Sequence, residues 1–306
     1  MRTPCNVPRI RLKFSIFLLA LISLPALSRT KRVPRSPETV ERHTDARLDG
    51  TLYRKCPLGH FGPKCAINIT AFYYEHDVYE GFEPLSEAQM SGWSPSKEFY
   101  VDIVTQVKPG LIVEVGVWRG LSLIYLASSL KELAGGGAVI AVDTWLGAPE
   151  FWNRKFSSGA KDATRDLRWK HGYPQVYYEF LSNVVKNDLQ DTVIPLPVPS
   201  RTAAQLLDEK KISADIIHID AAHEYESVVE DINIWFPILA EGGVLLGDDF
   251  SDSWPGVVQA ACEFADKLSV DLHNHGKKWW IYKTSSDNQR RSPSRARIEN
   301  CTSRVL

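Results

Sequence analysis

Several common sequence patterns are missing from the 306-residue chain. No two of its five cysteines have the C-x-x-C spacing of a zinc site, and the dinucleotide fingerprint G-x-G-x-x-G does not occur. The formal net charge is −1, so no global field favours nucleic acid or a membrane surface. These absences disfavour a zinc protein, an NAD-dependent oxidoreductase and a nucleic-acid-binding protein.

The longest apolar run, from Phe14 to Leu27, is short for a transmembrane helix. Basic residues precede it, and Ala26-Leu27-Ser28 fits a signal cleavage site. We expect residues 1–28 to be a signal peptide, because Pro25 breaks the helix just before the site. The alternative is an uncleaved anchor, in which case the protein would be membrane-bound. Either way the rest of the chain faces the secretory lumen (Golgi or endoplasmic reticulum) or is secreted.

Two further features agree with an oxidising, secretory compartment. Asn68 and Asn300 each begin an N-glycosylation sequon. Removal of the leader leaves four cysteines, an even number that permits disulfides. Cys56 and Cys65 enclose a short Gly/Pro-rich loop, and a bridge between them is the pairing we expect.

Composition divides the rest of the chain into three parts. Residues 29–70 are expected to be a stem that includes the short cysteine loop, and its first half is charged and poor in apolar residues. Residues 71–284 alternate between strand and helix patterns and are expected to form the folded domain. Residues 285–306 are basic and rich in serine, which favours a solvated tail over a binding patch.

The alternation within the domain predicts an α/β fold. We expect strands at 111–115, 138–142, 193–198, 215–219, 244–246 and 279–283, and helices at 122–133, 225–239 and 256–268. Such alternation gives a mostly parallel sheet that is covered by helices on both faces. Ligands of these sheets bind outside the carboxyl ends of the strands.

Acidic residues gather where this sheet would bind its ligand. Glu114, Asp143, Asp220, Asp248 and Asp249 all lie at or near the carboxyl end of a predicted strand. One such acid could be an ordinary turn residue. Five of them indicate a functional edge.

The first loop of the domain favours a cationic cofactor. Glu114, Gly116 and Gly120 form an E-x-G-x-x-x-G arrangement, in which the glycines allow a tight turn and close approach to a ligand. Glu114 would disfavour a pyrophosphate at the following helix. S-adenosylmethionine suits the loop because it carries an ammonium and a sulfonium group and no phosphate. Asp143 could then accept hydrogen bonds from its ribose hydroxyls.

This arrangement resembles the class I S-adenosylmethionine-dependent methyltransferases. The segments 142–152, 177–185, 218–250 and 254–265 are similar to a small-molecule O-methyltransferase family that includes bacterial enzymes methylating sugar hydroxyls on antibiotics. The resemblance covers roughly residues 95–283. It implies a Rossmann-like, doubly wound sheet of seven strands, mostly parallel, with the last strand antiparallel. The expected cofactor residues are Glu114, Gly116, Trp118, Gly120, Ser122, Asp143, Thr144, Trp145 and Asp220.

The resemblance also implies a divalent cation held by Asp220, Asp248 and Asp249. The chemistry of the residues agrees, since three converging carboxylates repel one another unless a cation neutralises them. A set of oxygen ligands suits Mg²⁺, which we expect, or Mn²⁺ or Ca²⁺. For Asp249, capping of the following segment is the alternative. The set lacks the two histidines of a non-haem iron hydroxylase.

The general base is the position where the chain departs from the family. Related sugar methyltransferases carry an aspartate two residues after the fourth-strand aspartate, and here that residue is Ala222. His223 is the natural substitute, with a local role at the start of the helix as its alternative. His218 lies on the same side of its strand as Asp220. It is either a partner of that aspartate or a core histidine with a satisfied hydrogen bond.

The long connection between residues 143 and 192 is rich in aromatic residues, including Trp145, Phe151, Trp152, Trp169, Tyr173, Tyr177 and Tyr178. They could form a lid or a sugar-stacking wall, or they could pack an inserted helix.

These observations predict an S-adenosylmethionine- and Mg²⁺-dependent O-methyltransferase that acts on a glycan or other small molecule in the secretory lumen. The expected partner is this acceptor, with no nucleic acid, and a homodimer is compatible with the sequence. The alternative is a catalytically silent, methyltransferase-like binding module, because a lumenal enzyme must import its cofactor and Ala222 removes a family base.

Overall fold

The computed structural model describes residues 77–91, 96–133, 137–152, 166–284 and 301. Seven strands in this part of the chain form one sheet in the order β3-β2-β1-β4-β5-β7-β6. They are β1 (Leu111–Val115), β2 (Ala138–Val142), β3 (Val193–Leu196), β4 (Ala214–Ile219), β5 (Leu239–Gly247), β6 (His273–His275) and β7 (Lys278–Tyr282). Strands β1 to β5 pair in parallel, whereas β7 is antiparallel to both β5 and β6. The predicted fold class and the antiparallel last strand are confirmed.

Strands β1 and β2 are apolar apart from Glu114, and every one of their residues is buried. Burial on both faces explains why these strands show no alternation of polar and apolar residues. Neighbours in β1 contribute to opposite cores, with Val113 on one face and Ile112 on the other. In register, Val113 lies between Ile140 of β2 and Ile217 of β4.

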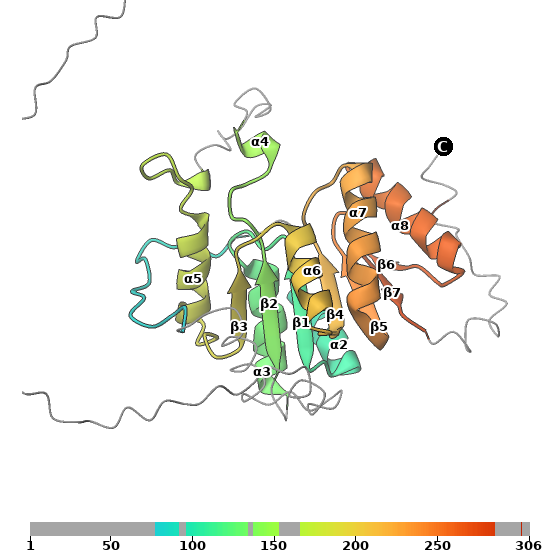
Figure 1. The fold of residues 1–306 in the computed structure, drawn as a ribbon, viewed down its shortest axis with the longest axis horizontal. Helices are drawn as coiled ribbons and strands as arrows, with labels where there is room; N and C mark the ends of the chain where they lie inside the picture. The colour runs from blue at the N-terminus through green and yellow to red at the C-terminus, as the bar shows by residue number, and fades with distance from the viewer. Residues whose placement is uncertain (1–76, 92–95, 134–136, 153–165, 285–300, 302–306) are drawn as a thin grey trace, which may run out of the picture. The chain divides into compact units, whose positions relative to one another are not determined.

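Helices cover both faces of the sheet (Figure 1). One face carries α6 (Ser200–Glu209), α7 (Tyr225–Trp235) and α8 (Pro255–Leu268), and the other carries α2 (Lys97–Val107), α3 (Leu121–Glu132) and α5 (Val176–Lys186). A short helix, α4 (Pro149–Trp152), follows β2. The crossovers between β1 and β5 carry the chain back to the amino edge of the sheet before each new parallel strand begins. The carboxyl ends of these strands therefore share the opposite edge, where the candidate site lies.

Several predicted boundaries change. The helix predicted over 225–239 ends at Trp235 and continues as the 3₁₀ turn η4 (Phe236–Ile238), because Pro237 cannot donate the hydrogen bond that an α-helix needs. Leu239 therefore begins β5, which is longer than the predicted 244–246. Strand β3 ends at Leu196, before the second proline of its segment. Helices α2 and α6 and strand β6 were not predicted.

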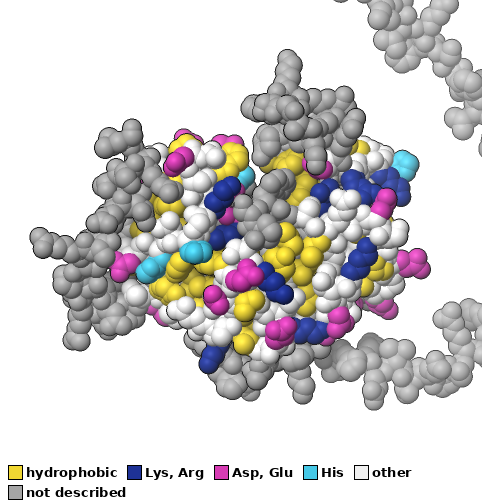
Figure 2. Space-filling view, turned by 180° about the vertical axis from the view of Figure 1, so that it is seen from behind, with side chains coloured by type: hydrophobic (Ala, Val, Ile, Leu, Met, Phe, Trp, Pro, Cys, Tyr) yellow, Lys and Arg dark blue, Asp and Glu magenta, His cyan; other side chains and the backbone are white. Residues whose placement is uncertain are grey.

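The described cysteines form a disulfide between Cys262 of α8 and Cys301, across 39 residues of sequence. The expected Cys56–Cys65 bridge lies outside the described residues, as do the predicted leader, the stem and most of the tail. Among the described helices, none is both long and apolar enough to cross a membrane. On the face in Figure 2, basic and acidic side chains of the described residues are interspersed, and neither sign forms a broad patch among them.

Candidate active site

The loop after β1 passes so close to the end of β4 that only glycine fits. Gly116 has a φ of 85°, and a Cβ placed there would lie 2.0 Å from the backbone oxygen of Asp220. The Gly116 amide donates to the carbonyl of Val142, and the Asp220 amide donates to that of Val115. Backbone hydrogen bonds therefore join the carboxyl ends of β1, β2 and β4 directly. Gly116 was predicted to allow a tight turn and close approach to a ligand; the group it approaches in the structure is the backbone of Asp220.

Glu114 is fully buried beneath this loop. Its Oε1 accepts a hydrogen bond from Ser122 Oγ at 2.5 Å and lies 3.0 Å from Nδ1 of His218, whereas Oε2 has no hydrogen-bond partner among the described residues. Burial raises the pKa of Glu114 to about 8, against the hydrogen bond from Ser122 and the charge of Lys278. A buried carboxyl with an unsatisfied oxygen fits the cation expected to bind there.

His218 is a partner of Glu114 and not of Asp220, although it shares the strand side of that aspartate. The imidazole is fully buried, and burial together with the charge of Lys278 lowers its pKa to about 3. It is therefore neutral over the physiological range. Its Nε2 has no hydrogen-bond partner among the described side chains and backbone. Of the two predicted roles, a core histidine describes His218 better than a partner of Asp220 does, although only one of its ring nitrogens has a hydrogen-bond partner among the described residues.

Asp143 fixes the loops that follow β1 and β2. One carboxylate oxygen accepts hydrogen bonds from the amides of Val117 and Trp118, at 2.8 and 2.9 Å, and the other accepts one from the amide of Trp145 at 2.7 Å. Burial raises the pKa of Asp143, and these amides oppose the rise. A carboxylate has about four acceptor sites, and backbone amides, with that of Thr144 among them, occupy most of these.

Aromatic rings support the same loops. Trp118 and Trp145 both have left-handed backbones, and the indole Nε1 of Trp145 donates to the carbonyl of Trp118 at 2.7 Å. Trp118 stacks on Phe151 at 4.7 Å between ring centroids, and Trp145 stacks on Phe180 of α5 at 4.8 Å. Thr144, the other expected cofactor residue of this loop, accepts a weaker hydrogen bond from the amide of Leu146 at 3.3 Å.

The aromatic residues of the long connection divide into buried and exposed rings. Trp145 is buried and packs the helix α5, as the packing alternative expects. In contrast, Trp152 and Tyr173 are 52% and 55% exposed, and Trp152 meets the half-exposed Trp169 edge to face at 4.6 Å. These exposed rings could contact an acceptor. Arg154, in the same connection, lies outside the described residues.

A buried ion-pair network joins the loop after β1 to α5. Glu179 is fully buried and pairs with Arg119 of the loop and, at 2.6 Å, with Arg168 of the long connection. Arg168 also pairs with Glu87 at 2.5 Å. Asn183, one turn after Glu179, donates to the carbonyl of Arg119 at 2.9 Å. This network holds three segments that are distant in sequence around one loop.

The carboxyl ends of β4 and β5 bring together Asp220, His223 and Asp249. One ligand atom from each lies within 4.8 Å of the others, so the group could hold a metal ion. Nε2 of His223 lies 2.9 Å from Oδ2 of Asp249, and its ring stacks on Trp254 at 4.0 Å. Burial raises the pKa of Asp220 well above its usual value, and the charge of Asp248 adds to the rise.

Asp248 is separate from this group. Its Oδ2 pairs with the ammonium of Lys278, which is buried in β7, and its Oδ1 accepts a hydrogen bond from the amide of Asp249 at 2.7 Å. Lys278 also donates to the hydroxyl of Tyr100 at 2.8 Å. The structure thus gathers two of the three predicted metal ligands, with His223 beside them in place of the third.

Sequence reasoning missed Tyr100, Arg119, Glu179 and Lys278. A signal was present for Lys278, since a lysine at the start of an otherwise apolar last strand needs a buried partner. Arg119 lies inside the recognised loop, where a basic residue three positions after Gly116 pointed to an acidic partner. Tyr100 belongs to the unpredicted helix α2, and Glu179 could not be distinguished from a solvated helix residue.

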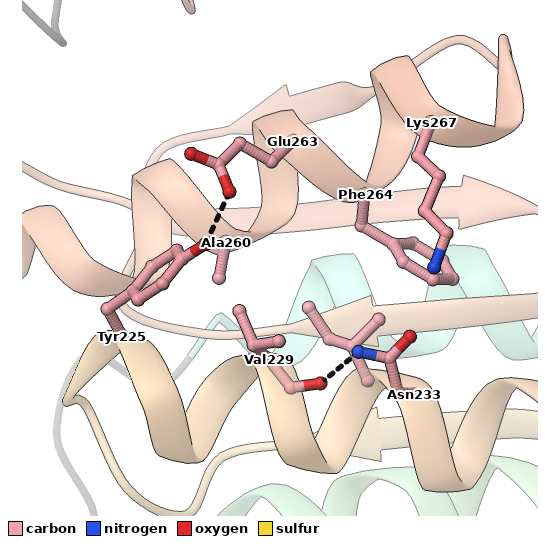
Figure 3. Close-up of a pocket in the computed structure, with 8 residues that line it drawn as sticks. Tyr225, Val229, Asn233, Ala260, Glu263, Phe264 and Lys267 are labelled. Atoms are coloured by element: carbon pink, nitrogen blue, oxygen red, sulfur yellow. Dashed lines mark hydrogen bonds between the residues drawn. The ribbon is translucent and has the colours of Figure 1, made fainter.

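A cavity of about 110 Å³ lies between α7 and α8 (Figure 3). Tyr225, Val229, Phe264 and Lys267 are among its lining residues, and the hydroxyl of Tyr225 donates to Glu263 across it at 2.5 Å. The predicted site residues do not line this cavity. It is therefore a feature of helix packing separate from the candidate site.

Residues 113–250 match the family model described as a methyltransferase domain. The match runs from β1 to the end of β5 and contains every predicted site residue. No curated protein sequence matches the chain.

Solved structures that resemble the chain include an O-methyltransferase from Bacillus cereus in complex with SAH, with 16% identity, a TM-score of 0.44 and coverage of 73% of this chain and 90% of that one. The calicheamicin methyltransferase CalS11 has 19% identity, a TM-score of 0.45 and coverage of 61% and 76%. TomG from Streptomyces achromogenes, an O-methyltransferase involved in tomaymycin synthesis, has 13% identity, a TM-score of 0.42 and coverage of 74% and 97%.

Proposed function

We propose that the protein is an S-adenosylmethionine-dependent O-methyltransferase that acts on a hydroxyl of a glycan or other small molecule in the secretory lumen. The observation that carries the proposal is the backbone junction at Gly116, where the loop after β1 meets Asp220 above the buried, half-satisfied Glu114. It lies within the region that matches a methyltransferase domain.

The cofactor would bind across the ends of β1 and β2. The ionised form of Glu114 would face its cationic end, and Asp143 would accept a ribose hydroxyl in addition to the amides it already holds. Trp118 and Trp145 hold the loops after β1 and β2 together through their left-handed backbones and the hydrogen bond between them. The ion pairs of Glu179 anchor the loop after β1 to α5. Because the loop is already ordered, binding of the cofactor would cost little conformational entropy.

Methyl transfer needs an acceptor oxygen in line with the methyl group and a base for its proton. With S-adenosylmethionine bound, the acceptor oxygen would form a bond to the methyl carbon while the carbon–sulfur bond breaks with its electron pair going to sulfur. The imidazole of His223 would accept the hydroxyl proton. Asp249, 2.9 Å from Nε2 of His223, orients the ring and stabilises its protonated form. His223 thereby takes the role that Ala222 cannot.

The residues at this edge also fit a divalent cation. Asp220 and Asp249 offer oxygen ligands, and Mg²⁺ in proteins is held by one or two carboxylates with water and substrate oxygens completing its shell. A bound cation would lower the pKa of a coordinated hydroxyl, which makes the hydroxyl a better nucleophile. Of the predicted ligands, Asp248 is already engaged by Lys278.

The lumenal location rests on the predicted leader and sequons alone, and the glycan acceptor on that location. The exposed rings of Trp152, Trp169 and Tyr173 support a sugar-binding wall, because aromatic faces can stack on sugar rings.

Calorimetry of the full chain with S-adenosylmethionine, with and without Mg²⁺, tests the proposal, followed by transfer of a labelled methyl group to glycan and small hydroxylated acceptors. We expect binding and Mg²⁺-stimulated transfer. Absence of binding would overturn the proposal. Binding without transfer to any acceptor would favour the catalytically silent module.

A further inference from the structure

Asp248 and Lys278 form a buried ion pair where β5 ends and β7 begins, beside Asp249 of the candidate site. Each side chain is only 4% exposed. Lys278 begins β7, which pairs with β5 so that Gly247 and Trp279 are partners in register. The residue after Gly247 and the residue before Trp279 therefore meet at the end of the same ladder. The antiparallel geometry of the last strand is what brings this lysine to the aspartate.

The contacts of this pair engage both oxygens of Asp248. The ammonium of Lys278 donates to Oδ2 of Asp248 and to the hydroxyl of Tyr100, and it lies 5.0 Å from the centre of the Tyr100 ring. The other oxygen of Asp248 accepts the amide of Asp249 at 2.7 Å. A buried carboxylate with a buried ammonium beside it is already neutralised, so it does not need a metal ion.

The same pair determines how Asp249 is presented. Asp249 has a left-handed backbone with a φ of 60°, which is unfavourable for a residue other than glycine. Its amide is held by Asp248, and its carbonyl accepts the amide of Ser251 at 2.7 Å. In this conformation the Asp249 carboxylate reaches His223 at 2.9 Å. The two adjacent aspartates therefore have different tasks, one directed inward to Lys278 and one outward to His223.

We propose that Lys278 is the resident cation of Asp248, and that this pair is a positioning element that holds Asp249, so that Asp220 and Asp249 bind the divalent ion without Asp248. The inference rests on the proposed function, which supplies the reason for an ion at this edge. It assigns Lys278 and Asp248 roles as positioning residues that touch neither substrate nor cofactor.

The proposal makes an unusual prediction about charge removal. In Lys278→Met, Asp248 loses its resident cation and remains a buried carboxylate close to Asp220 and Asp249. A divalent ion should then recruit it as a third ligand. Removal of a residue near the site would therefore tighten metal binding, which a merely structural role for Lys278 would not produce.

The experiment is a titration of full-length protein with Mn²⁺, in which the electron paramagnetic resonance signal of free Mn²⁺ gives the affinity. We expect Lys278→Met to bind Mn²⁺ about tenfold more tightly than the wild type, because ligand charge sets affinity. The double variant Asp248→Asn, Lys278→Met, which removes both charges, should stay within about threefold of the wild type. Asp220→Asn and Asp249→Asn should each weaken binding by about tenfold or more.

A matched control is the pair of Lys211 and Asp208, whose side chains lie 3.2 Å apart and are largely exposed. Lys211→Met removes the same charge from the surface and should leave Mn²⁺ affinity unchanged. If Lys278→Met does not fold, Lys278→Gln replaces it, since the amide can still donate to Asp248 without a charge. A thermal melt of either variant should show a larger stabilisation by Mn²⁺ than the wild type.

The proposal is overturned if the double variant loses Mn²⁺ affinity as strongly as Asp220→Asn, which would make Asp248 a ligand. It is also overturned if Lys278→Met binds Mn²⁺ no more tightly than the wild type, including the case in which neither binds it. Binding of S-adenosylmethionine is measured on the same samples. If the wild type does not bind S-adenosylmethionine, the proposed function is contradicted. The present inference depends instead on how the Mn²⁺ affinities of the variants rank against that of the wild type.

Discussion

Asp143 and Asp248 both follow a parallel strand at the same edge of the sheet, yet they are held by different means. Asp143 accepts hydrogen bonds from three backbone amides within its own loop and the neighbouring one. Asp248 is held by the ammonium of Lys278, which comes from a strand thirty residues later. The half of the edge at β1 and β2 is therefore built from local backbone, and the half at β4 and β5 from charges brought together by the fold.

The two halves of the edge should therefore tolerate amino-acid substitutions differently. Any sequence in the same backbone conformation supplies these amides, so the half at β1 and β2, the proposed cofactor half, depends on Gly116 and on the network around Glu179. The half at β4 and β5, the proposed acceptor half, depends on the identity of a few charged side chains, because each buried charge needs its partner. Substitutions should therefore affect one half at a time, and measurements of cofactor binding and of catalysis should separate.

Gly116→Ala should have the largest effect. Its Cβ would lie 2.0 Å from a backbone oxygen, and alanine is strained at a φ of 85°. We expect a loss of more than about 4 kcal/mol in the free energy of unfolding, and loss of S-adenosylmethionine binding. Urea unfolding and calorimetry measure these. Gly172→Ala is the control, because Gly172 has a φ of 80° with open space around it, and it should cost only about 1–2 kcal/mol.

Glu179→Ala should come next. It leaves Arg119, which is 8% exposed on its side chain, buried without its partner carboxylate. We expect a cost of about 3 kcal/mol in unfolding free energy and weaker binding of S-adenosylmethionine, with Mn²⁺ affinity at the other half unchanged. The exposed pair of Arg201 and Glu230 offers the control, since Glu230→Ala should change stability by less than about 0.5 kcal/mol. Equal loss of both affinities would contradict the division into halves.

His223→Asn tests the acceptor half alone. Loss of the proposed base should lower kcat by about 100-fold, or about 2.7 kcal/mol in the barrier, with the dissociation constant of S-adenosylmethionine unchanged. Single-turnover methyl transfer measures the rate, and calorimetry measures the binding. The control is His275→Asn, on the exposed strand β6. A parallel loss of cofactor affinity would place His223 with the cofactor and not with the acceptor.

The pH dependence of cofactor binding should give the smallest effect. The pKa of Glu114 is about 8 in the folded protein, so below pH 8 a proton must leave when a cationic ligand binds beside it. The affinity for S-adenosylmethionine should therefore rise with pH, by at most about tenfold per unit, and level off above pH 8. Glu114→Gln should abolish the slope. A slope that persists in this variant would assign it to another group.

The sequence predicted the arrangement at β1 and β2 better than the arrangement at β4 and β5, because the first depends on local backbone and the second on tertiary pairing. Apolar runs identify β1, β2, β4 and β5, and in a parallel sheet their carboxyl ends must share one edge. That is enough to bring Glu114, Gly116 and Asp143 together. The partner of Asp248 depends on which strand pairs with β5 and in which direction. No local pattern around Asp248 contains this information.

The missed elements differ in their local signals. Helix α6 had a clear one, since it buries Ala203, Ala204 and Leu207 on one face, exposes Arg201 and Asp208 on the other, and consists largely of good helix formers. Strand β6 consists of His273, Asn274 and His275, with no alternation of apolar residues, and it pairs with the edge of β7. For β6, tertiary pairing outweighs local propensity.

The bond between Cys262 and Cys301 has a consequence for proteolysis. The 38 residues between the two cysteines contain the end of α8, both last strands and the basic segment that begins at residue 285. A protease that cuts the chain once within this stretch produces two fragments that remain covalently joined. They should migrate as one species under non-reducing conditions and separate after reduction, so a nicked molecule would keep Lys278 attached to the domain.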